Sequence, residues 1–357
     1  MLRLLALGVV AMLLTACGGG GDDDSTGSTT AAAPATATAE AMATSTADPA
    51  TGSEADVTTA PDDSSAPASS GNTETAGGQT LQELLGLEDA TIDTPDVALM
   101  GGADFATGIE TRVPFIVLTK DGGEIVEPDG GTAEVYLAPD AQSPAAGPFT
   151  ATVESLETPG ARFEPGIPHS VWIADVPLPA PGPYFLVARY TVDGAERSAN
   201  TSLNVQPEES TPAVGSAAPK SETPTLESTG GDLAKLTTAD PPDTTLLEHS
   251  VADSIEARTP FVVTFSTPKF CQSRICGPIV DIVLDVQKRM GGTPMRFIHA
   301  EIYKDNDPAA GVSPWVTEWG LPSEPWVFVV DATGTVTAKF EGGVTPDELE
   351  AAARAAL

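Results

Sequence analysis

Residues 261–290, FVVTFSTPKFCQSRICGPIVDIVLDVQKRM, hold the pattern on which the fold prediction depends. The first five residues are a continuous β-branched and aromatic run, which is typical of a strand buried on both faces of a sheet. A polar turn with Cys271 and Cys276 follows, and Gly277 and Pro278 then lead into a segment with apolar residues at helical spacing. Pro278 suits the first helical position, where its missing N–H costs nothing. The sequence therefore predicts two cysteines between a buried strand and a helix N-terminus, where the helix dipole favours a thiolate.

The start of the chain resembles the signal segment of bacterial lipoproteins. Arg3 precedes an apolar run too short to span a bilayer, and the run ends in Leu-Thr-Ala-Cys at residues 14–17. This ending is similar to the lipobox. The resemblance implies a signal peptide over residues 1–16, a lipidated Cys17 and an extracytoplasmic protein anchored to the membrane of the bacterial cell envelope. An ordinary signal peptide with an unrelated cysteine is the alternative.

The charge of the chain excludes nucleic acid as a partner. The 357 residues include 17 basic and 51 acidic side chains, a formal net charge of −34, and such a surface repels other polyanions. Residues 17–80 are built largely from small and polar residues with scattered acids, so we expect a disordered acidic tether. Residues 207–243, rich in Pro, Ser, Thr and Glu, are expected to be a second linker.

Residues 95–206 show short alternating runs separated by turn signals. The clearest hairpin joins residues 184–192 to residues 195–205 through Asp193 and Gly194. Other strands are expected at residues 113–119, 132–138, 149–155 and 170–176. Strands at this spacing without a helical period predict an all-β immunoglobulin-like sandwich, with a spacer or partner-binding role.

Residues 244–357 return to an α/β pattern. Further strands are expected at residues 295–303, 325–331 and 335–341, and short helices at residues 250–257 and 314–319. Residues Thr345-Pro346-Asp347-Glu348 predict the start of the closing helix, because they form a capping box with proline at the first helical position.

This last segment resembles the thioredoxin-like family. The resemblance rests on Cys276-Gly277-Pro278, on the segment from Trp319 to Pro325, and on the Asp-x-x-Gly turn at residues 331–334. It implies an α/β thioredoxin-like domain with a cis peptide bond before Pro325. It also implies a substrate groove lined by Glu324, Pro325 and Trp326. The family's second cysteine would fall at Ile279, so the partner of Cys276 must be Cys271.

The cysteine pair leaves several functions open. We expect a thiol–disulfide oxidoreductase that acts on exported proteins, with Cys276 as nucleophile and Cys271 as resolving residue, or the reverse. Its redox partner is unidentified, and neither a cofactor nor a metal is expected. The alternatives are a redox-inert scaffold with a structural disulfide and, with less support, a copper-binding chaperone that uses His299.

Overall fold

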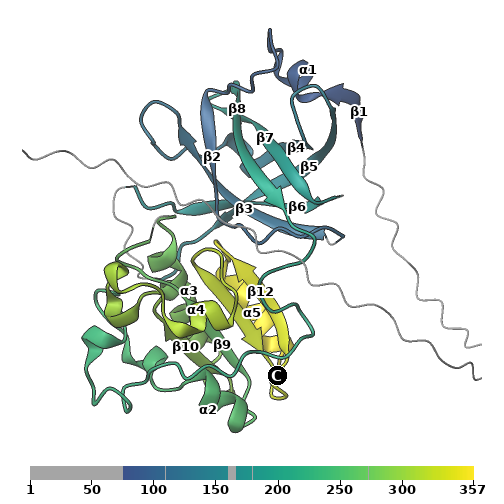
Figure 1. Cartoon of the computed structure of the whole chain (residues 1–357). Helices are drawn as coiled ribbons and strands as arrows, with labels where there is room; N and C mark the ends of the chain where they lie inside the picture. Colours follow the sequence, from purple (N-terminus) through teal and green to yellow (C-terminus); the bar gives the residue numbers. More distant parts are fainter. Residues whose placement is uncertain (1–74, 109, 160–165, 179, 272) are drawn as a thin grey trace, which may run out of the picture. The chain divides into compact units, whose positions relative to one another are not determined.

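The computed structural model describes residues 75–108, 110–159, 166–178, 180–271 and 273–357 of the chain (Figure 1). The predicted signal peptide, the lipidated Cys17 and the tether as far as residue 74 lie outside these ranges. The predictions about them therefore stay predictions.

Eight strands between residues 75 and 205 form a single sheet (Figure 1). They are β1 (Thr75–Thr80), β2 (Asp96–Met100), β3 (Glu110–Thr119), β4 (Thr132–Ala138), β5 (Pro144–Ser155), β6 (Ser170–Pro177), β7 (Gly182–Val192) and β8 (Ala195–Val205). Their order is β1-β5-β4-β7-β8-β2-β3-β6, and β5 pairs with β6 as well. This additional pairing closes the strands β2–β8 into a seven-stranded barrel, while β1 lies beside β5. Closure removes the unpaired edges that an open sheet would present.

The barrel contradicts the predicted immunoglobulin-like sandwich. A sandwich consists of two sheets packed face to face, whereas residues 151–155 pair with residues 170–174 and join the two ends of one sheet. The six predicted strands are present close to their predicted positions, but the sequence does not predict β1 and β2, and β1 occupies the end of the expected tether. β4 has the predicted bounds, and the hairpin of β7 and β8 is paired along its whole length. The error concerns which strands are neighbours, because that choice depends on contacts between distant parts of the chain.

A buried carboxylate joins three barrel strands. Asp96 on β2 is fully buried and accepts two hydrogen bonds from the Arg197 guanidinium on β8. The Tyr190 hydroxyl on β7 donates a third bond of 2.5 Å to the same carboxylate. Burial, together with this bond to Asp96, raises the pKa of Tyr190 far above its usual range. Beside this cluster, the Tyr190 ring packs edge-on against the buried Trp172.

A second, four-stranded sheet follows with the order β10-β9-β11-β12 (Figure 1). Its strands are β9 (Phe261–Phe265), β10 (Arg296–Ala300), β11 (Trp326–Val330) and β12 (Val336–Glu341). β9 and β10 are parallel and are connected through α3 (Cys276–Arg289), whereas β11 and β12 form an antiparallel hairpin. The other helices are α1 (Leu81–Leu85), α2 (Val251–Glu256), α4 (Pro314–Glu318) and α5 (Pro346–Ala355). Short 3-10 turns are η1 (Asp129–Gly131), η2 (Leu233–Lys235), η3 (Thr244–Leu247), η4 (Lys304–Asn306) and η5 (Pro308–Ala310).

Apolar clusters cover both faces of this small sheet. Val262 of β9 packs in the cluster that contains the apolar residues of α3 and α5. Its neighbours Phe261 and Val263 pack in the other cluster, with Val251 of α2 and Val316 of α4. All five residues of β9 are buried, so the prediction of a strand buried on both faces is confirmed.

The predicted fold class is nevertheless wrong for this half of the chain too. The described residues are mostly β-structure, and the small sheet has one parallel strand pair, β9 with β10. Only α3 and α5, of 14 and 10 residues, are longer than two turns in the described part of the chain. With so few helices, the described residues do not form a clear α/β thioredoxin fold.

Residues 207–243 also differ from the long disordered linker that their composition suggests. Thr211, Ser221 and Leu236 are buried, and the Trp319 indole N–H donates a 3.0 Å hydrogen bond to the Ser221 hydroxyl. Ala217 forms a bridge with Thr335, just before β12. Buried Ser and Thr side chains of this segment therefore serve as hydrogen-bonding partners. A composition rich in Ser and Thr does not show which of these residues will be buried in this way.

One carboxylate on β12 connects the small sheet to the segment after β2. Glu341 accepts backbone N–H groups of Ala103 and Asp104 at 2.6 and 3.0 Å, and the Ser323 hydroxyl at 2.5 Å. Asp104 is itself buried and accepts hydrogen bonds from Ser210 and Thr211. The residues around Glu341 therefore belong to one hydrogen-bonded network.

Removing the buried carboxylate should weaken the barrel strongly. We expect Asp96→Ala to lower the free energy of unfolding by about 3 kcal/mol, because Arg197 and the Tyr190 hydroxyl lose their partner. The matched control is Asp93→Ala, which breaks an exposed ion pair with Lys120 and should cost at most about 1 kcal/mol. Urea unfolding of both variants measures the difference. Equal losses would show that Asp96 does not hold these strands together.

Candidate functional site

The site centres on a disulfide between Cys271 and Cys276, with the two Cα atoms 5.9 Å apart. Cys276 is the first residue of α3, and Cys271 lies in the loop that leads to it from β9. The predicted pairing of these cysteines is confirmed. Cys271 lies between the buried strand and the helix as predicted, whereas Cys276 lies inside the helix rather than before it.

The two sulfur-bearing residues differ in exposure. Cys276 is fully buried, whereas Cys271 is half-buried and reaches the surface. Thiol–disulfide exchange begins with attack on an accessible sulfur, and of the two residues only Cys271 is partly exposed. The sequence left both orders of attack open, and the geometry favours Cys271 as the exchanging residue.

The Cys271 sulfur also completes the start of α3. The residue before the helix, Ile275, makes no side-chain capping bond. Instead, the Cys276 backbone N–H donates to the Cys271 sulfur at 3.2 Å. This N–H is one of the unpaired amides at a helix N-terminus, where the helix dipole adds positive potential. The same contact would stabilise a thiolate on Cys271 in the reduced protein.

The helix begins earlier than the sequence predicts. Pro278 is the third residue of α3 rather than the first. The third position also lacks an intrahelical N–H bond, so proline is tolerated there for the same reason. This two-residue difference places the Cys276 amide inside the helix and makes it a donor to Cys271.

Ser273 connects the disulfide to the loop before β11. Its hydroxyl lies 3.3 Å from the Cys271 sulfur and donates to the Glu324 carbonyl oxygen at 3.4 Å. The Glu324–Pro325 peptide bond is cis, as the sequence resemblance implies. The predicted groove residue Glu324 is therefore brought to the cysteines through its backbone.

The other two predicted groove residues lie inside the fold. Pro325 is buried, and the Trp326 side chain is 2% exposed and stacks on Phe328 at 5.3 Å. The Trp326 indole N–H is buried without a hydrogen-bond partner in the described part of the chain. In this conformation Trp326 presents almost no surface to a substrate.

Two aromatic rings meet next to Cys271 in the chain, and the sequence did not identify either as a site residue. The half-buried rings of Phe270 and Tyr303 meet edge to face with their centroids 6.1 Å apart. The Lys269 ammonium lies 5.4 Å from the centre of the Phe270 ring. Burial and the nearby Glu324 charge raise the pKa of Tyr303. Phe270 adjoins Cys271 in sequence, whereas Tyr303 comes from the loop after β10 and carries no local signal.

His299 lies in the core and uses both ring nitrogens. Its Nε2 atom contacts the Ser266 hydroxyl and carbonyl at 3.1 and 3.2 Å, and its Nδ1 atom contacts the Thr237 hydroxyl at 3.3 Å. Burial lowers the pKa of His299. No group of three or more His, Cys, Asp or Glu residues within the described ranges could hold a metal ion. A copper site at His299 therefore has no support from the geometry.

Arg274 joins the cysteine loop to the loop before β6. It has a positive φ of 65°, and its guanidinium lies 3.4 Å from the Gly166 carbonyl oxygen as a hydrogen-bond donor. The surroundings of the disulfide thus include a residue from the segment predicted as a separate sandwich.

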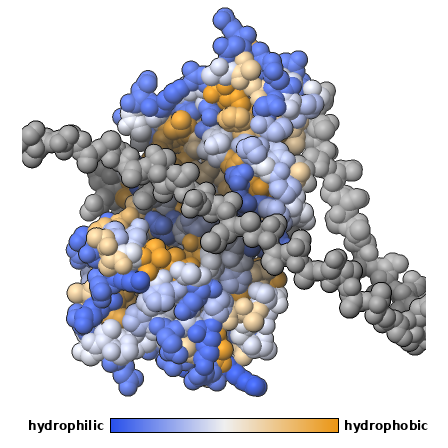
Figure 2. Space-filling view, viewed as in Figure 1, coloured by the Kyte–Doolittle hydropathy of each residue, from blue (hydrophilic) through white to orange (hydrophobic). Residues whose placement is uncertain are grey.

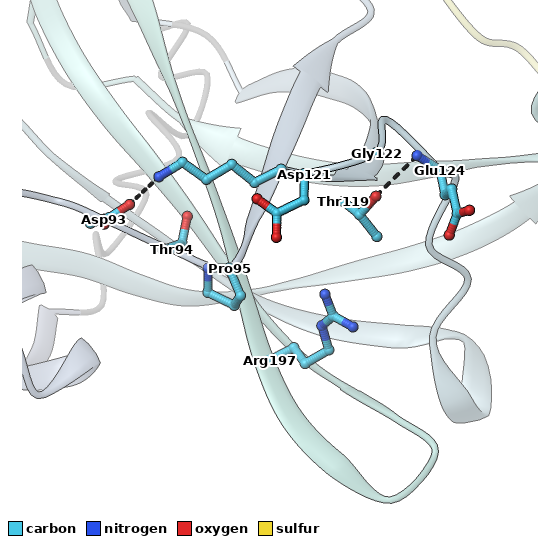
Figure 3. A pocket seen from close by; sticks show the side chains of 9 residues that line it. Asp93, Thr94, Pro95, Thr119, Asp121, Gly122, Glu124 and Arg197 are labelled. Carbon is cyan, nitrogen blue, oxygen red and sulfur yellow. Dashed lines mark hydrogen bonds and ion pairs between the residues drawn. The ribbon is translucent and has the colours of Figure 1, made fainter.

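A polar pocket of about 710 Å³ opens on the barrel itself (Figure 3). Its cations already have carboxylate partners, since Lys120 pairs with Asp93 and Arg197 pairs with Asp96. Asp121 and Glu124 add negative charge from an exposed turn. No cysteine or histidine lines the pocket, so the disulfide remains the stronger candidate.

Comparisons with known proteins leave the family open. No family model and no curated protein matches the chain. Two solved structures are weak neighbours. A thiol:disulfide interchange protein of the thioredoxin family from Chlorobium tepidum TLS is 16% identical, with 29% of this chain and 83% of that chain covered and a TM-score of 0.24. The M4 domain of titin is 17% identical, with 32% and 100% covered and a TM-score of 0.16.

The difference in exposure gives a direct test. In the chain with Cys17→Ser, reduced with dithiothreitol and then freed of it, iodoacetamide should modify Cys271 at least tenfold faster than Cys276. Peptide mass spectrometry after a time course measures both rates, and the urea-unfolded chain, in which the rates should converge, is the control. Faster modification of Cys276 would contradict the assignment of Cys271 as the exchanging residue.

Proposed function

We propose that this chain is a thiol–disulfide oxidoreductase that exchanges disulfides with exported proteins through Cys271 and Cys276. The observation that carries the proposal is the arrangement of the pair at the start of α3. Cys271 is half-buried and its sulfur accepts the first helix amide, while Cys276 is fully buried. A disulfide with one accessible and one protected sulfur suits exchange with a second protein.

The exchange proceeds in two balanced steps. A partner thiolate attacks the Cys271 sulfur, a mixed disulfide forms, and the Cys271–Cys276 bond breaks with the electron pair on Cys276. A second partner thiolate then attacks the mixed disulfide and releases Cys271 as a thiolate, so that the pair gains two electrons and the partner dithiol becomes a disulfide. The reverse sequence reduces a partner disulfide. The Cys276 amide supports the Cys271 thiolate in both directions.

The disulfide would stabilise the fold only slightly if its role were purely structural. In the chain-entropy model, a disulfide that closes so short a loop contributes roughly 2 kcal/mol. The loop is already held at both ends by buried elements, β9 and α3. We therefore favour chemistry over a static crosslink.

The proposed location follows from the first 17 residues. The lipobox-like ending at Cys17 supports a lipid anchor, with the disulfide acting outside the cytoplasm. Among the helices that the structure describes, none has the length and apolar character needed to cross a membrane. The oxidising compartment in which exported proteins fold is where such a pair would act.

Single cysteine variants test the mechanism. In a Cys17→Ser background, Cys276→Ser should form a mixed disulfide with a thiol-containing partner peptide activated as its thionitrobenzoate disulfide, and the adduct should persist because no resolving thiol remains. Cys271→Ser should form little adduct and, like Cys276→Ser, should lose turnover of an insulin-type substrate. Mass spectrometry detects the adduct. Full turnover by either variant would remove that cysteine from the mechanism.

The reduction potential separates exchange from a structural role. Equilibration of the Cys17→Ser chain with glutathione and thioredoxin buffers should give a potential between roughly −120 and −270 mV, the range of working oxidoreductases. A value below roughly −300 mV would instead identify a stable structural disulfide and a scaffold protein.

A further inference from the structure

We propose that the surface around Cys271 selects partner cysteines that have an acidic residue beside them. The surface, named the cysteine collar, consists of Lys269, Phe270, Cys271, Arg274 and Tyr303. This inference rests on the proposed function, and it names the class of partner that the disulfide would take.

The collar is cationic on a chain that is otherwise strongly acidic. The formal net charge is −34, and ion pairs occupy most of the described basic side chains, such as those of Arg112, Arg189 and Arg289. Lys269 and Arg274 are exposed and take part in none of the ion pairs among the described residues. Two cations without carboxylate partners therefore lie within three residues of the accessible sulfur.

The two rings supply a contact surface beside these charges. Phe270, the residue before Cys271, and Tyr303 are both half-buried, and their rings meet edge to face. Apolar surface of this kind can hold the backbone and stems of an extended peptide. Elsewhere the exposed large hydrophobic residues of the described chain are scattered, and in the space-filling view hydrophobic areas are separated by hydrophilic ones (Figure 2). The collar thus combines an apolar contact with unpaired positive charge.

The two rings of the collar lie near different charges. The Lys269 ammonium lies against Phe270, whereas the Glu324 charge acts on Tyr303. The Lys269 ammonium is therefore the positive charge of the collar that lies against the Phe270 ring. The acidic residue of a fitting partner is expected on this side of its cysteine.

The expected size of the effect is modest and measurable. Two unit charges about 6 Å apart in water change a rate by about threefold, and the effect weakens above about 0.15 M salt because exposed charges are screened. A threefold preference for anions and a matching penalty for cations together give a ratio of about ten.

Three small thiols of different charge provide the experiment. 2-Mercaptoethanesulfonate is anionic, 2-mercaptoethanol is neutral and cysteamine is cationic. Each is used to reduce the Cys271–Cys276 disulfide in the full chain carrying Cys17→Ser, at low ionic strength and constant pH. Each rate is divided by that of the same thiol with bis(2-hydroxyethyl) disulfide, which removes differences in thiol pKa and nucleophilicity. Acid quenching and mass spectrometry follow the loss of the protein disulfide.

Variants that change the charge at Lys269 test whether this residue causes the preference for anionic thiols. We expect the normalised anion-to-cation rate ratio to exceed one in the parent chain, to fall at least threefold in Lys269→Gln, and to drop below one in Lys269→Glu. Lys288→Gln is the matched control, because it removes one exposed positive charge at the far end of α3 that makes no ion pair within the described ranges. Its ratio should stay close to that of the parent, and 1 M sodium chloride should remove the preference.

The outcomes separate this inference from the function beneath it. A ratio at or below one in the parent, or equal losses in Lys269→Gln and Lys288→Gln, would overturn the acidic-partner inference while leaving exchange intact. A disulfide that reacts with none of the three thiols would overturn the proposed function, and this inference with it.

Discussion

The fixed position of β9 is the constraint on which the site depends. This strand is buried along its whole length and is hydrogen-bonded to β10 on one side and β11 on the other. It cannot shift without opening the sheet, and α3 is held just as firmly by buried residues such as Ile279 and Val283. The cysteine loop therefore runs between two buried elements that are fixed by pairing and packing. Such a loop can present one sulfur to solvent and keep the other in the core without any part of it having to rearrange.

Local elements follow from the sequence, whereas their pairing does not. Asp193-Gly194 predicts the hairpin of β7 and β8 because only certain residues suit its turn, and the capping box at Thr345 and Glu348 is present as predicted. The closure of the barrel through β5 and β6 has no such signal. An alternating strand buries one face equally well in a sandwich or in a barrel, so pattern alone does not choose between them. The predicted α/β class fails for a related reason, since strand order and helix content are properties of the assembled chain.

The site shows the same division. The Cys271–Cys276 pair is predictable, because thiols are rare and these two lie five positions apart in the chain. Which sulfur is exposed depends on where α3 starts, and the proline signal places that start two residues too late. Tyr303 and Ser221 reach their places through tertiary contacts, from segments that look like a strand end and a linker. Trp326 is predicted in a groove but is buried, because its side of β11 faces the core.

The carboxylate of Glu341 limits how the two sheets of this chain could have been combined by domain recombination. It accepts hydrogen bonds both from the backbone of Ala103 and Asp104 and from Ser323, the residue before Glu324. A β12 strand transplanted without the segment after β2 would carry a partly desolvated acid that has lost two of its three donors. The barrel segment could therefore not be exchanged for an unrelated domain without loss of these hydrogen bonds. A recombination event that replaced the barrel would also require a different residue at position 341. The Ser323–Glu324 loop, which lies beside the cysteine loop, would then lose its hydrogen bond to Glu341.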